Sequence, residues 1–548
     1  MQRGIVAASD WTHTSRIIMF QRIPMPQSGH HRSFEFRSLH SVTAFTIAVY
    51  AVLSGQLICA PGVDAEPSDR PSIVLIMADD MGFSDIGCYG GEVDTPNLNR
   101  MAKQGVRFKQ FYNNAKCTTT RASLITGLYP RPKGGLLKRN MVTIGEVLRE
   151  AGYKTSLSGK WHLGNGETTH PFRRGFDRYY GLLDGCCNFF EPTLADPPFK
   201  GGRIRKFGHD DKPITEFPND YYTTDAFTDH AVESIQQFSQ ADEPFFVHVC
   251  YTAPHYPLHA KPKDIAKYRG KYMLGWDVLR QQRHERQLAM GLLDPNWKLS
   301  DTDSKSYDWE ASNKEWEDLR MAVYAAMIDS MDQNIGRILR ALDEQGVSDN
   351  TLIMFLSDNG GCAEEPGGRN TQVIPGPKDF YTAVGPAWGW AQNAPFRRYK
   401  SWVHEGGIST PFIARWPAVI KANTMTNEVA HLIDLMATCV DLGKATYPTN
   451  YNGNEILPLE GISMTPLLRG ETRQGHETLC WEWSGNRAIR QGKWKLVWDK
   501  LVKKWELYDV VADRTEMNNL ADADKARAKA MAKAWFGWAD TTGARYAR

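Results

Sequence analysis

Nearly continuous apolar stretches alternate along the chain with stretches in which apolar residues recur every three or four positions. The continuous stretches are rich in β-branched and aromatic side chains, which is typical of strands buried on both faces of a parallel sheet. The other stretches have the spacing of helices that bury one face. The predicted strands are 71–78, 106–112, 153–157, 244–250 and 351–356. The predicted helices are 95–105, 142–151, 224–238 and 319–345, with a further helix beginning at Cys117.

This alternation predicts an α/β fold, with a doubly wound, mostly parallel sheet flanked by helices. Towards the C-terminus, 487–498 and 504–508 have the pattern of antiparallel strands, and 522–538 has that of a covering helix. We therefore expect a smaller C-terminal α+β domain that contains an antiparallel sheet. The predicted organisation is a leader at 1–65, a main α/β domain at 70–442 and a C-terminal α+β subdomain at 455–548.

Three segments lack a regular pattern. Residues 261–318 are charged, contain tryptophan and have weak periodicity, so we expect a surface insertion there. The stretches 362–396 and 443–461 are rich in glycine and proline, which predicts loops.

The N-terminal segment has the layout of an export signal. Five arginines within residues 1–41 precede an apolar run at 42–60, and small residues follow, with Ala60 and Ala65 as candidate cleavage points. Two alternatives remain open: an uncleaved membrane anchor and a lipoprotein signal at Cys59. We expect an exported protein, periplasmic or extracellular, that is attached to a membrane only if the leader is not cleaved.

Charge and cysteine content narrow the function classes. The formal net charge of the 548 residues is +2, so no overall field favours a nucleic acid partner, and any attraction for anions must be local. Nine cysteines are too few for a disulfide scaffold at this length. They allow one or two disulfide bonds, but the sequence does not determine which cysteines would pair.

Oxygen-bearing side chains follow two of the predicted buried strands. Asp79 and Asp80 end the first, and Asp358 and Asn359 end the strand at 351–356. The carboxyl ends of parallel strands are where open α/β sheets place ligands, and clustered carboxylates repel each other unless a cation joins them. An all-oxygen set favours Ca²⁺ or Mg²⁺ over zinc. The alternative is that Asp79 and Asp80 only cap a turn.

A cysteine stands at the predicted start of a helix. Cys117 directly precedes a threonine-capped, apolar-periodic run, where unpaired amide donors and the helix dipole favour an anion. Arg121, four residues later, would share its face of the helix. The alternative is a small buried thiol near a solvated arginine.

Two further segments carry candidate chemistry. Lys160 and His162 are two residues apart in an extended stretch, so both can face one anion. His255 lies between Pro254 and Pro257, and a histidine near its ordinary pKa of about 6.5 is suited to proton transfer. For each of these residues a solvated or structural role is the common alternative.

Several segments, in order along the chain, resemble the signatures of type I sulfatases, which are formylglycine-dependent members of the alkaline phosphatase superfamily. The family pattern Cys-x-Pro/Ala-x-Arg fits Cys117 and Arg121, with Thr119 where proline or alanine is usual. The resemblance is closest to bacterial arylsulfatases and implies an alkaline-phosphatase-like fold. The matching segments are 74–82 (VLIMADDMG), 117–121 (CTTTR), 159–164 (GKWHLG), 252–259 (TAPHYPLH), 356–361 (LSDNGG) and 400–407 (KSWVHEGG).

The resemblance implies hydrolysis of sulfate monoesters, either small aryl sulfates or carbohydrate sulfates. The nucleophile would be the gem-diol of a formylglycine made from Cys117 by a maturation enzyme. The implied ligands of one Ca²⁺ ion are Asp79, Asp80, Asp358, Asn359 and formylglycine 117.

The same resemblance implies roles for the remaining residues. Lys160 and Lys400 would hold the sulfate from opposite sides, and Arg121 would help to neutralise it. His162 would contact the formylglycine hydroxyl and help to expel sulfate. His255 would protonate the departing alcohol, and Asp358 would serve as the base.

Two alternatives differ in class. One is a phosphomonoesterase or phosphodiesterase of the same superfamily, although such relatives usually bind two zinc ions and have histidine where Asn359 stands. The other is an inactive protein that binds sulfated glycans, with Trp388, Trp390 and Trp402 stacking on sugars.

Overall fold

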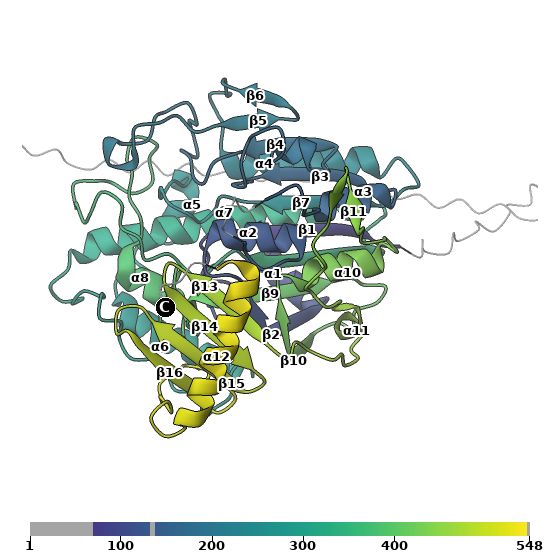
Figure 1. Ribbon diagram of the computed structural model, residues 1–548. Helices are drawn as coiled ribbons and strands as arrows, with labels where there is room; N and C mark the ends of the chain where they lie inside the picture. The colour runs from purple at the N-terminus through teal and green to yellow at the C-terminus, as the bar shows by residue number, and fades with distance from the viewer. Residues whose placement is uncertain (1–69, 132–136, 545–548) are drawn as a thin grey trace, which may run out of the picture. The chain divides into compact units, whose positions relative to one another are not determined.

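A ten-stranded sheet forms the centre of the protein in a computed structural model, which describes residues 70–131 and 137–544 (Figure 1). The five predicted strands are all present, with ends within two residues of the predicted ones. In spatial order the strands are β10 (Thr424–His431), β2 (Val106–Tyr112), β9 (Ser409–Arg415), β8 (Thr351–Ser357), β1 (Ser72–Ala78), β7 (Phe245–Cys250), β3 (Lys154–Gly159), β4 (Arg178–Leu182), β5 (Phe207–His209) and β6 (Lys212–Ile214).

The sheet is mostly parallel, as predicted. Strands β8, β1, β7, β3 and β4 run parallel to one another, and β10 runs parallel to β2. Strand β9 is antiparallel to both of its neighbours, and β5 and β6 extend the far edge as antiparallel strands. The core strands β1, β7 and β8 are almost completely buried, which explains their continuous apolar sequences.

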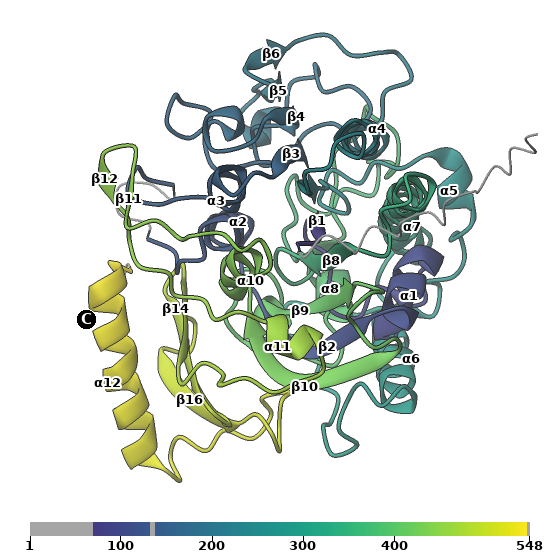
Figure 2. The same cartoon turned by 90° about the vertical axis from the view of Figure 1, so that its right-hand side faces the viewer.

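Helices cover both faces of the sheet (Figure 2). One face packs against α1 (Pro96–Lys103), α4 (Thr223–Phe238) and α7 (Lys314–Glu344). The other face packs against α2 (Cys117–Thr126), α3 (Ile144–Glu150) and α10 (Asp434–Leu442). Alternate residues of β1 point to these two layers, Val74 and Ile76 to the first and Ile73 and Leu75 to the second. The doubly wound α/β prediction is therefore confirmed.

The segment 261–318 is only in part the surface insertion that was predicted, because many of its side chains are exposed but others are fully buried. It contains α5 (Pro262–Ala266) and α6 (Gly275–Ala289), and the Trp276 side chain of α6 is completely buried. Arg283 is also buried, where it pairs with Asp85 at 2.7 Å and with Glu92 at 2.8 Å. The residues that anchor α6 are tryptophan and arginine, so an apolar pattern did not reveal its buried side.

The predicted loops contain short regular elements. Within 362–396 lies α8 (Gly385–Ala391), and within 443–461 lies the hairpin of β11 (Asn450–Tyr451) and β12 (Asn454–Glu455). Trp388, Trp390 and Trp402 are 0%, 2% and 5% exposed, so the prediction that they stack on sugars was wrong. They pack in the core of the main sheet instead.

A second, antiparallel sheet forms near the C-terminus and is covered by a helix (Figure 1). Its strands are β13 (Leu479–Trp483), β14 (Asn486–Gln491), β15 (Trp494–Asp499) and β16 (Lys504–Asp509), and the helix is α12 (Lys525–Thr542). The predicted α+β arrangement is confirmed, with β13 as an additional strand. The remaining short helices are α9 (Glu405–Ile408) and α11 (Thr465–Leu468).

The predicted leader and its cleavage points, together with Cys59, lie outside the described residues. Across 70–131 and 137–544, we find no helix with the length and apolar character needed to cross a membrane. The eight cysteines of these ranges, from Cys88 to Cys480, are buried free thiols.

Candidate active site

Four oxygen-bearing residues meet at the carboxyl ends of β1 and β8. These two strands are neighbours in the sheet, so Asp79 and Asp80 after β1 lie beside Asp358 and Asn359 after β8. All four are completely buried. The backbone N–H of Asp80 donates to Asp358 Oδ1 at 3.1 Å, and Asn359 Nδ2 donates to Asp80 Oδ1 at 2.7 Å. The structure thus brings the four predicted ligands together, while their role as ligands stays a prediction.

The backbone at Asp80 adopts a left-handed conformation, with φ of 65°. A residue with a side chain rarely adopts this conformation without local compensation, and such residues cluster at functional sites. Here it turns the Asp80 carboxylate towards Lys400 and His255.

Three buried cations face the three carboxylates. Arg121 Nη2 of α2 lies 2.8 Å from Asp358 Oδ2. Lys160, just beyond β3, places Nζ 2.6 Å from Asp79 Oδ2, and Lys400 places Nζ 2.6 Å from Asp80 Oδ2. The side chains of these six residues are at most 3% exposed. Each cation is therefore paired with a carboxylate in a region of low dielectric constant, where opposite charges interact strongly.

The pKa values of the two aspartates that follow β1 shift in opposite directions. Burial raises the pKa of Asp79 well above its ordinary range, although Lys160 opposes this effect. Burial also acts to raise the pKa of Asp80, but Lys400, 2.6 Å away, holds it well below the usual value. A divalent cation at this position would favour the ionised form of both carboxyl groups.

Cys117 is the first residue of α2 and is buried. Burial raises the pKa of its thiol, against the opposing fields of Lys160 and Lys400. The predicted threonine cap was wrong: Lys116 is the N-cap residue and its side chain makes no capping bond. Thr119 instead donates its hydroxyl to the carbonyl oxygens of Asn114 and Lys116, at 3.1 and 3.0 Å. This contact ties the first turn of α2 to the preceding loop.

His255 carries its proton on Nδ1. That nitrogen lies 2.6 Å from the carbonyl oxygen of Tyr256, which can only accept. Nε2 faces Lys400 Nζ and Asp80 Oδ2, each at 3.4 Å. Burial lowers the pKa of His255 well below its ordinary value, and Lys400 adds to the shift while Asp80 opposes it.

His162 lies in a strained turn after β3, with φ of 59°. Its Nδ1 is buried and has no hydrogen-bond partner in the described ranges. Burial lowers its pKa well below the ordinary value, and the fields of Lys160 and Arg121 act in the same direction. Gly185 packs closely against the ring. A Cβ atom at position 185 would lie only 2.5 Å from His162 Cε1, so there is no space for a side chain.

The residues fit a hard metal ion. Asp79, Asp80 and His255 offer ligand atoms that all lie within 4.8 Å of one another. Asp79 Oδ1 and Asn359 Oδ1 are buried acceptors that lack a donor among the described residues. Buried acceptors seldom remain unpaired, and a carboxylate and an amide oxygen are ligands that Ca²⁺ or Mg²⁺ prefers. A rotation of the Asn359 side-chain amide exchanges its oxygen and nitrogen, which have nearly the same shape, so the oxygen can also face the ion.

Sequence reasoning missed a cluster beside these residues. Glu364 accepts hydrogen bonds from Lys116 Nζ at 2.7 Å and from the Tyr256 hydroxyl at 2.5 Å, and it lies 3.8 Å from Lys400 Nζ. The available signal was weak: Lys116 adjoins Cys117, and Glu364 follows Asp358 by six residues.

Arg397 and Arg398, which precede Lys400 in the chain, are both held by side-chain partners. Arg398 is 11% exposed at its side chain and pairs with Asp303 and Asp499. Arg397 donates to the Tyr508 hydroxyl of the C-terminal sheet at 2.8 Å.

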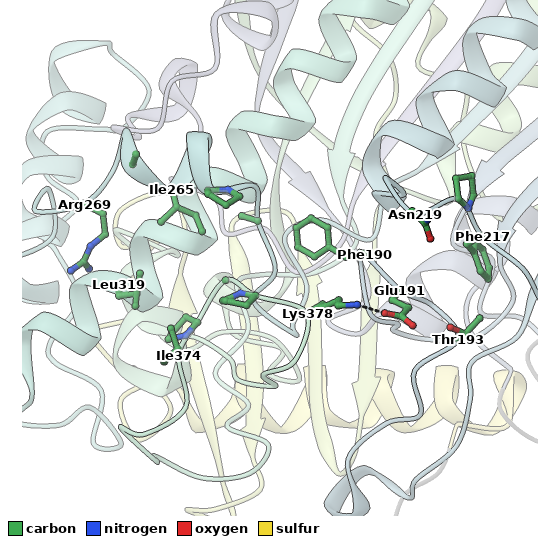
Figure 3. A pocket seen from close by; sticks show the side chains of 17 residues that line it. Phe190, Glu191, Thr193, Phe217, Asn219, Ile265, Arg269, Leu319, Ile374 and Lys378 are labelled. Atoms are coloured by element: carbon green, nitrogen blue, oxygen red, sulfur yellow. Dashed lines mark hydrogen bonds and ion pairs between the residues drawn. The ribbon is translucent and has the colours of Figure 1, made fainter.

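A cavity of about 850 Å³ lies among loops and the short helix α5 (Figure 3). Phe190, Phe217 and Ile374 line it, and Lys378 pairs with Glu191 across it. None of the candidate catalytic residues in the part of the chain that the structure describes lines this cavity. It is therefore separate from the cluster around Cys117.

Comparisons with known proteins agree with the resemblance. A family model described as sulfatase matches residues 71–445, and a model of the C-terminal part of N-sulphoglucosamine sulphohydrolase matches residues 396–534. The chain is 31% identical to an uncharacterised sulfatase of Schizosaccharomyces pombe, over 87% of this chain and 94% of that protein. It is 29% identical to an arylsulfatase of Klebsiella aerogenes, over 76% and 96%.

Solved structures give the same result. The crystal structure of Ps i-CgsB matches with a TM-score of 0.64 and 27% identity, covering 86% of this chain and 92% of that one. The structural match and the family model over residues 71–445 therefore point to the same group of enzymes. The chain belongs to the sulfatase family and is a sulfuric ester hydrolase.

Proposed function

We propose that the protein hydrolyses sulfate monoesters of carbohydrates or aryl alcohols, using a formylglycine made from Cys117 and one Ca²⁺ ion. One observation carries this proposal: Arg121, Lys160 and Lys400 converge, fully buried, on Asp358, Asp79 and Asp80. With a divalent ion on the carboxylates, the three cations would hold an anion in a preorganised field, which is often the largest catalytic term.

The absent groups have candidate positions. Formylglycine at position 117 supplies, when hydrated, a geminal diol as nucleophile, and the start of α2 provides a setting that favours an anion. Asp79, Asp80, Asp358 and Asn359 would hold the Ca²⁺ ion, which supplies positive charge for the sulfate oxygens.

The side chains of the chain itself bind the sulfate and move protons. Lys160, Lys400 and Arg121 neutralise the sulfate oxygens. His255 Nε2 is the ring nitrogen free to take up a proton, because Nδ1 is committed to the Tyr256 carbonyl. The negative charge of a bound sulfate ester favours that protonation, and the imidazolium then donates to the departing oxygen. His162, neutral in its buried turn, can accept a proton from position 117 when sulfate leaves.

The carbohydrate form of the substrate has support from a relative. A second structure of Ps i-CgsB, 26% identical to this chain with a TM-score of 0.63, is a complex with k-i-k-neocarrahexaose. The basic and then apolar leader supports export, so we propose that the protein acts on its substrate in the periplasm or outside the cell.

Peptide mass spectrometry and two chromogenic substrates test the proposal. The peptide that contains residue 117 should weigh about 18 Da less than its cysteine form, the difference expected for formylglycine. The natively matured protein should turn over 4-nitrophenyl sulfate much faster than 4-nitrophenyl phosphate, and Cys117→Ala should abolish both activities. A preference for the phosphate would establish the phosphatase alternative, and an unmodified cysteine in natively expressed protein would favour the inactive glycan binder.

A further inference from the structure

We propose that Glu364 selects the leaving group: its carboxylate accepts a hydrogen bond from a free hydroxyl of the sugar that carries the sulfate ester. The inference rests on the proposed function and concerns the side of the same site where the alcohol departs. It assigns to this chain a preference for carbohydrate sulfates over aryl sulfates.

The position of Glu364 is the first argument. Its carboxylate bonds Lys116, which immediately precedes Cys117 in the chain, and lies 3.8 Å from Lys400 Nζ. Lys400 in turn holds Asp80 at 2.6 Å and approaches His255 at 3.4 Å. Glu364 therefore shares the neighbourhood of Lys400 with His255, and its two hydrogen-bond donors, Lys116 and Tyr256, directly adjoin Cys117 and His255 in the chain.

Exposure is the second argument. The Glu364 side chain is 39% exposed, whereas those of Asp79, Asp80 and Asp358 are at most 1% exposed. A hydroxyl of the departing alcohol can therefore reach this carboxylate more readily than the other three. A carboxylate has about four acceptor positions, and Lys116 and the Tyr256 hydroxyl take one each, so capacity remains for a further donor.

The neighbouring aromatic side chains are the third argument. The ring of Tyr256 lies 6.1 Å from that of Tyr381, which lies 5.7 Å from that of Phe199. Phe199 is 54% exposed. Lys200 Nζ reaches the Tyr256 hydroxyl at 3.2 Å. Flat apolar faces beside a few directed polar groups are typical of sites that bind sugars.

These features distinguish the two kinds of leaving group. Aromatic rings can pack against a pyranose or against a phenol, so they do not discriminate. A phenol, however, has no second hydroxyl to donate to Glu364. A site built to accept a hydrogen bond disfavours the analogue that lacks the donor, because its polar group is then left unpaired.

Two variants of the full-length, matured protein test this inference. We would measure kcat/KM for 4-nitrophenyl sulfate and for hexose and hexosamine sulfates esterified at O2, O4 or O6. Glu364→Ala should lower kcat/KM for the best sugar sulfate about 10- to 100-fold, as expected for loss of a hydrogen bond to a charged group. The value for 4-nitrophenyl sulfate should change less than about threefold. Glu364→Gln keeps an acceptor oxygen and should lose less.

Glu243→Ala is the matched control. Its side chain is 50% exposed and lies 3.8 Å from Lys154, at the amino ends of β7 and β3, whereas the site lies at the carboxyl ends of the strands. It should leave both values unchanged, and melting curves should be alike for all variants.

Three results would overturn the inference while leaving sulfate hydrolysis intact. They are equal losses on both substrates, no loss on the sugar sulfate, and a wild-type enzyme that cleaves the aryl sulfate but none of the sugar sulfates. Equal losses would mean that Glu364 acts only by positioning Lys400 or Lys116. A matured wild type that cleaves no sulfate ester would instead overturn the proposed function, and this inference with it.

Discussion

At the scale of single residues, the position of the His162 ring depends on a neighbouring glycine, Gly185. The His162 ring occupies space that a side chain at position 185 would fill. A Cβ atom built on Gly185 would lie 2.5 Å from His162 Cε1 and 2.6 Å from Nε2. Both distances are far inside van der Waals contact. The His162 ring also lacks a partner at Nδ1 among the described residues, so packing rather than hydrogen bonding sets its orientation there.

We expect Gly185→Ala to lower kcat/KM for an aryl sulfate about 10- to 100-fold, because displacement of a catalytic group by about 1 Å can cost a factor of that size. The change would be measured by steady-state kinetics, with the melting temperature as a check on folding. Gly475→Ala is the control, because a Cβ at Gly475 meets nothing within 4 Å. Unchanged kinetics in Gly185→Ala would show that His162 does not need its present position.

Asn359 provides a second prediction at this scale. Asn359→Leu keeps the approximate volume but removes the oxygen that lacks a donor, so Ca²⁺ affinity should fall about 10- to 100-fold, the size seen when supporting groups of metal sites are removed. Calorimetric titration of chelator-treated protein measures this affinity. Asn99→Leu is the control, since Asn99 also has a buried unpaired amide oxygen but lies in α1. Equal Ca²⁺ affinities for Asn359→Leu and wild type would rule out Asn359 as a ligand.

At the scale of elements, the central strand β7 carries a buried titratable group. His248 is 3% exposed, and its Nδ1 lies 2.9 Å from the carbonyl oxygen of Leu75 on β1. Burial lowers its pKa to about 4. As pH falls below about 6.5, the unfolded chain therefore takes up this proton before the folded protein does. The stability contributed by neutral His248 is complete above pH 6.5 and is lost between about 6.5 and 4.

We predict that the free energy of unfolding falls between pH 6.5 and 4.5, and that His248→Phe flattens this fall. One proton taken up on unfolding corresponds to about 1.4 kcal/mol per pH unit, which is the largest change in slope that His248 can cause. Urea titrations at several pH values measure the slope. The control His209→Phe replaces an exposed histidine and should leave the slope unchanged. If both variants retain the wild-type slope, β7 is not the source of the acid sensitivity.

At the scale of the whole molecule, the C-terminal sheet is joined to the main sheet by buried ion pairs. Lys495 of β15 lies 2.8 Å from both Glu405 and Glu516, and Arg514 lies 2.9 Å from Glu405. Glu405 begins α9, five residues after Lys400. These side chains are at most 1% exposed. Removing one partner would leave a buried charge uncompensated, which is strongly destabilising.

Lys495→Met should therefore lower the free energy of unfolding by about 3–5 kcal/mol. Lys493→Met, which removes a side chain that is 53% exposed and pairs with Asp509, should change it by less than about 1 kcal/mol. Urea denaturation followed by tryptophan fluorescence gives both values. Similar small losses in the two variants would mean that this network does not bind the sheets together.

Much of this arrangement is predictable from the sequence, for reasons that differ between elements. Strands β1 and β8 are buried on both faces, so their continuous apolar runs and the acids that end them are visible in the sequence. The place of Asp79 beside Asp358 then follows from parallel pairing. Helix α6 was not predictable, because arginine and tryptophan form its buried side.

The contacts around Glu364 were not predictable either, since they depend on how separate loops meet in three dimensions. Lys116, Tyr256 and Lys400 come from different parts of the chain, and no local pattern marks the residue that joins them. For the same reason, the sequence suggested that Trp388 is available to a ligand, whereas α6 and α7 cover it.

The contacts of Lys160 and Lys400 have a consequence for how the two ligands of the site influence each other. Each ammonium group is already engaged by a carboxylate, so an arriving sulfate must compete with Asp79 and Asp80 for it. A divalent ion that takes over those carboxylates frees the two ammonium groups. Because such coupling is reciprocal, bound sulfate should raise the affinity of the protein for the ion by the same factor. Inorganic sulfate and the metal ion should therefore bind cooperatively. In the presence of either one, the protein should be half-saturated at a lower concentration of the other.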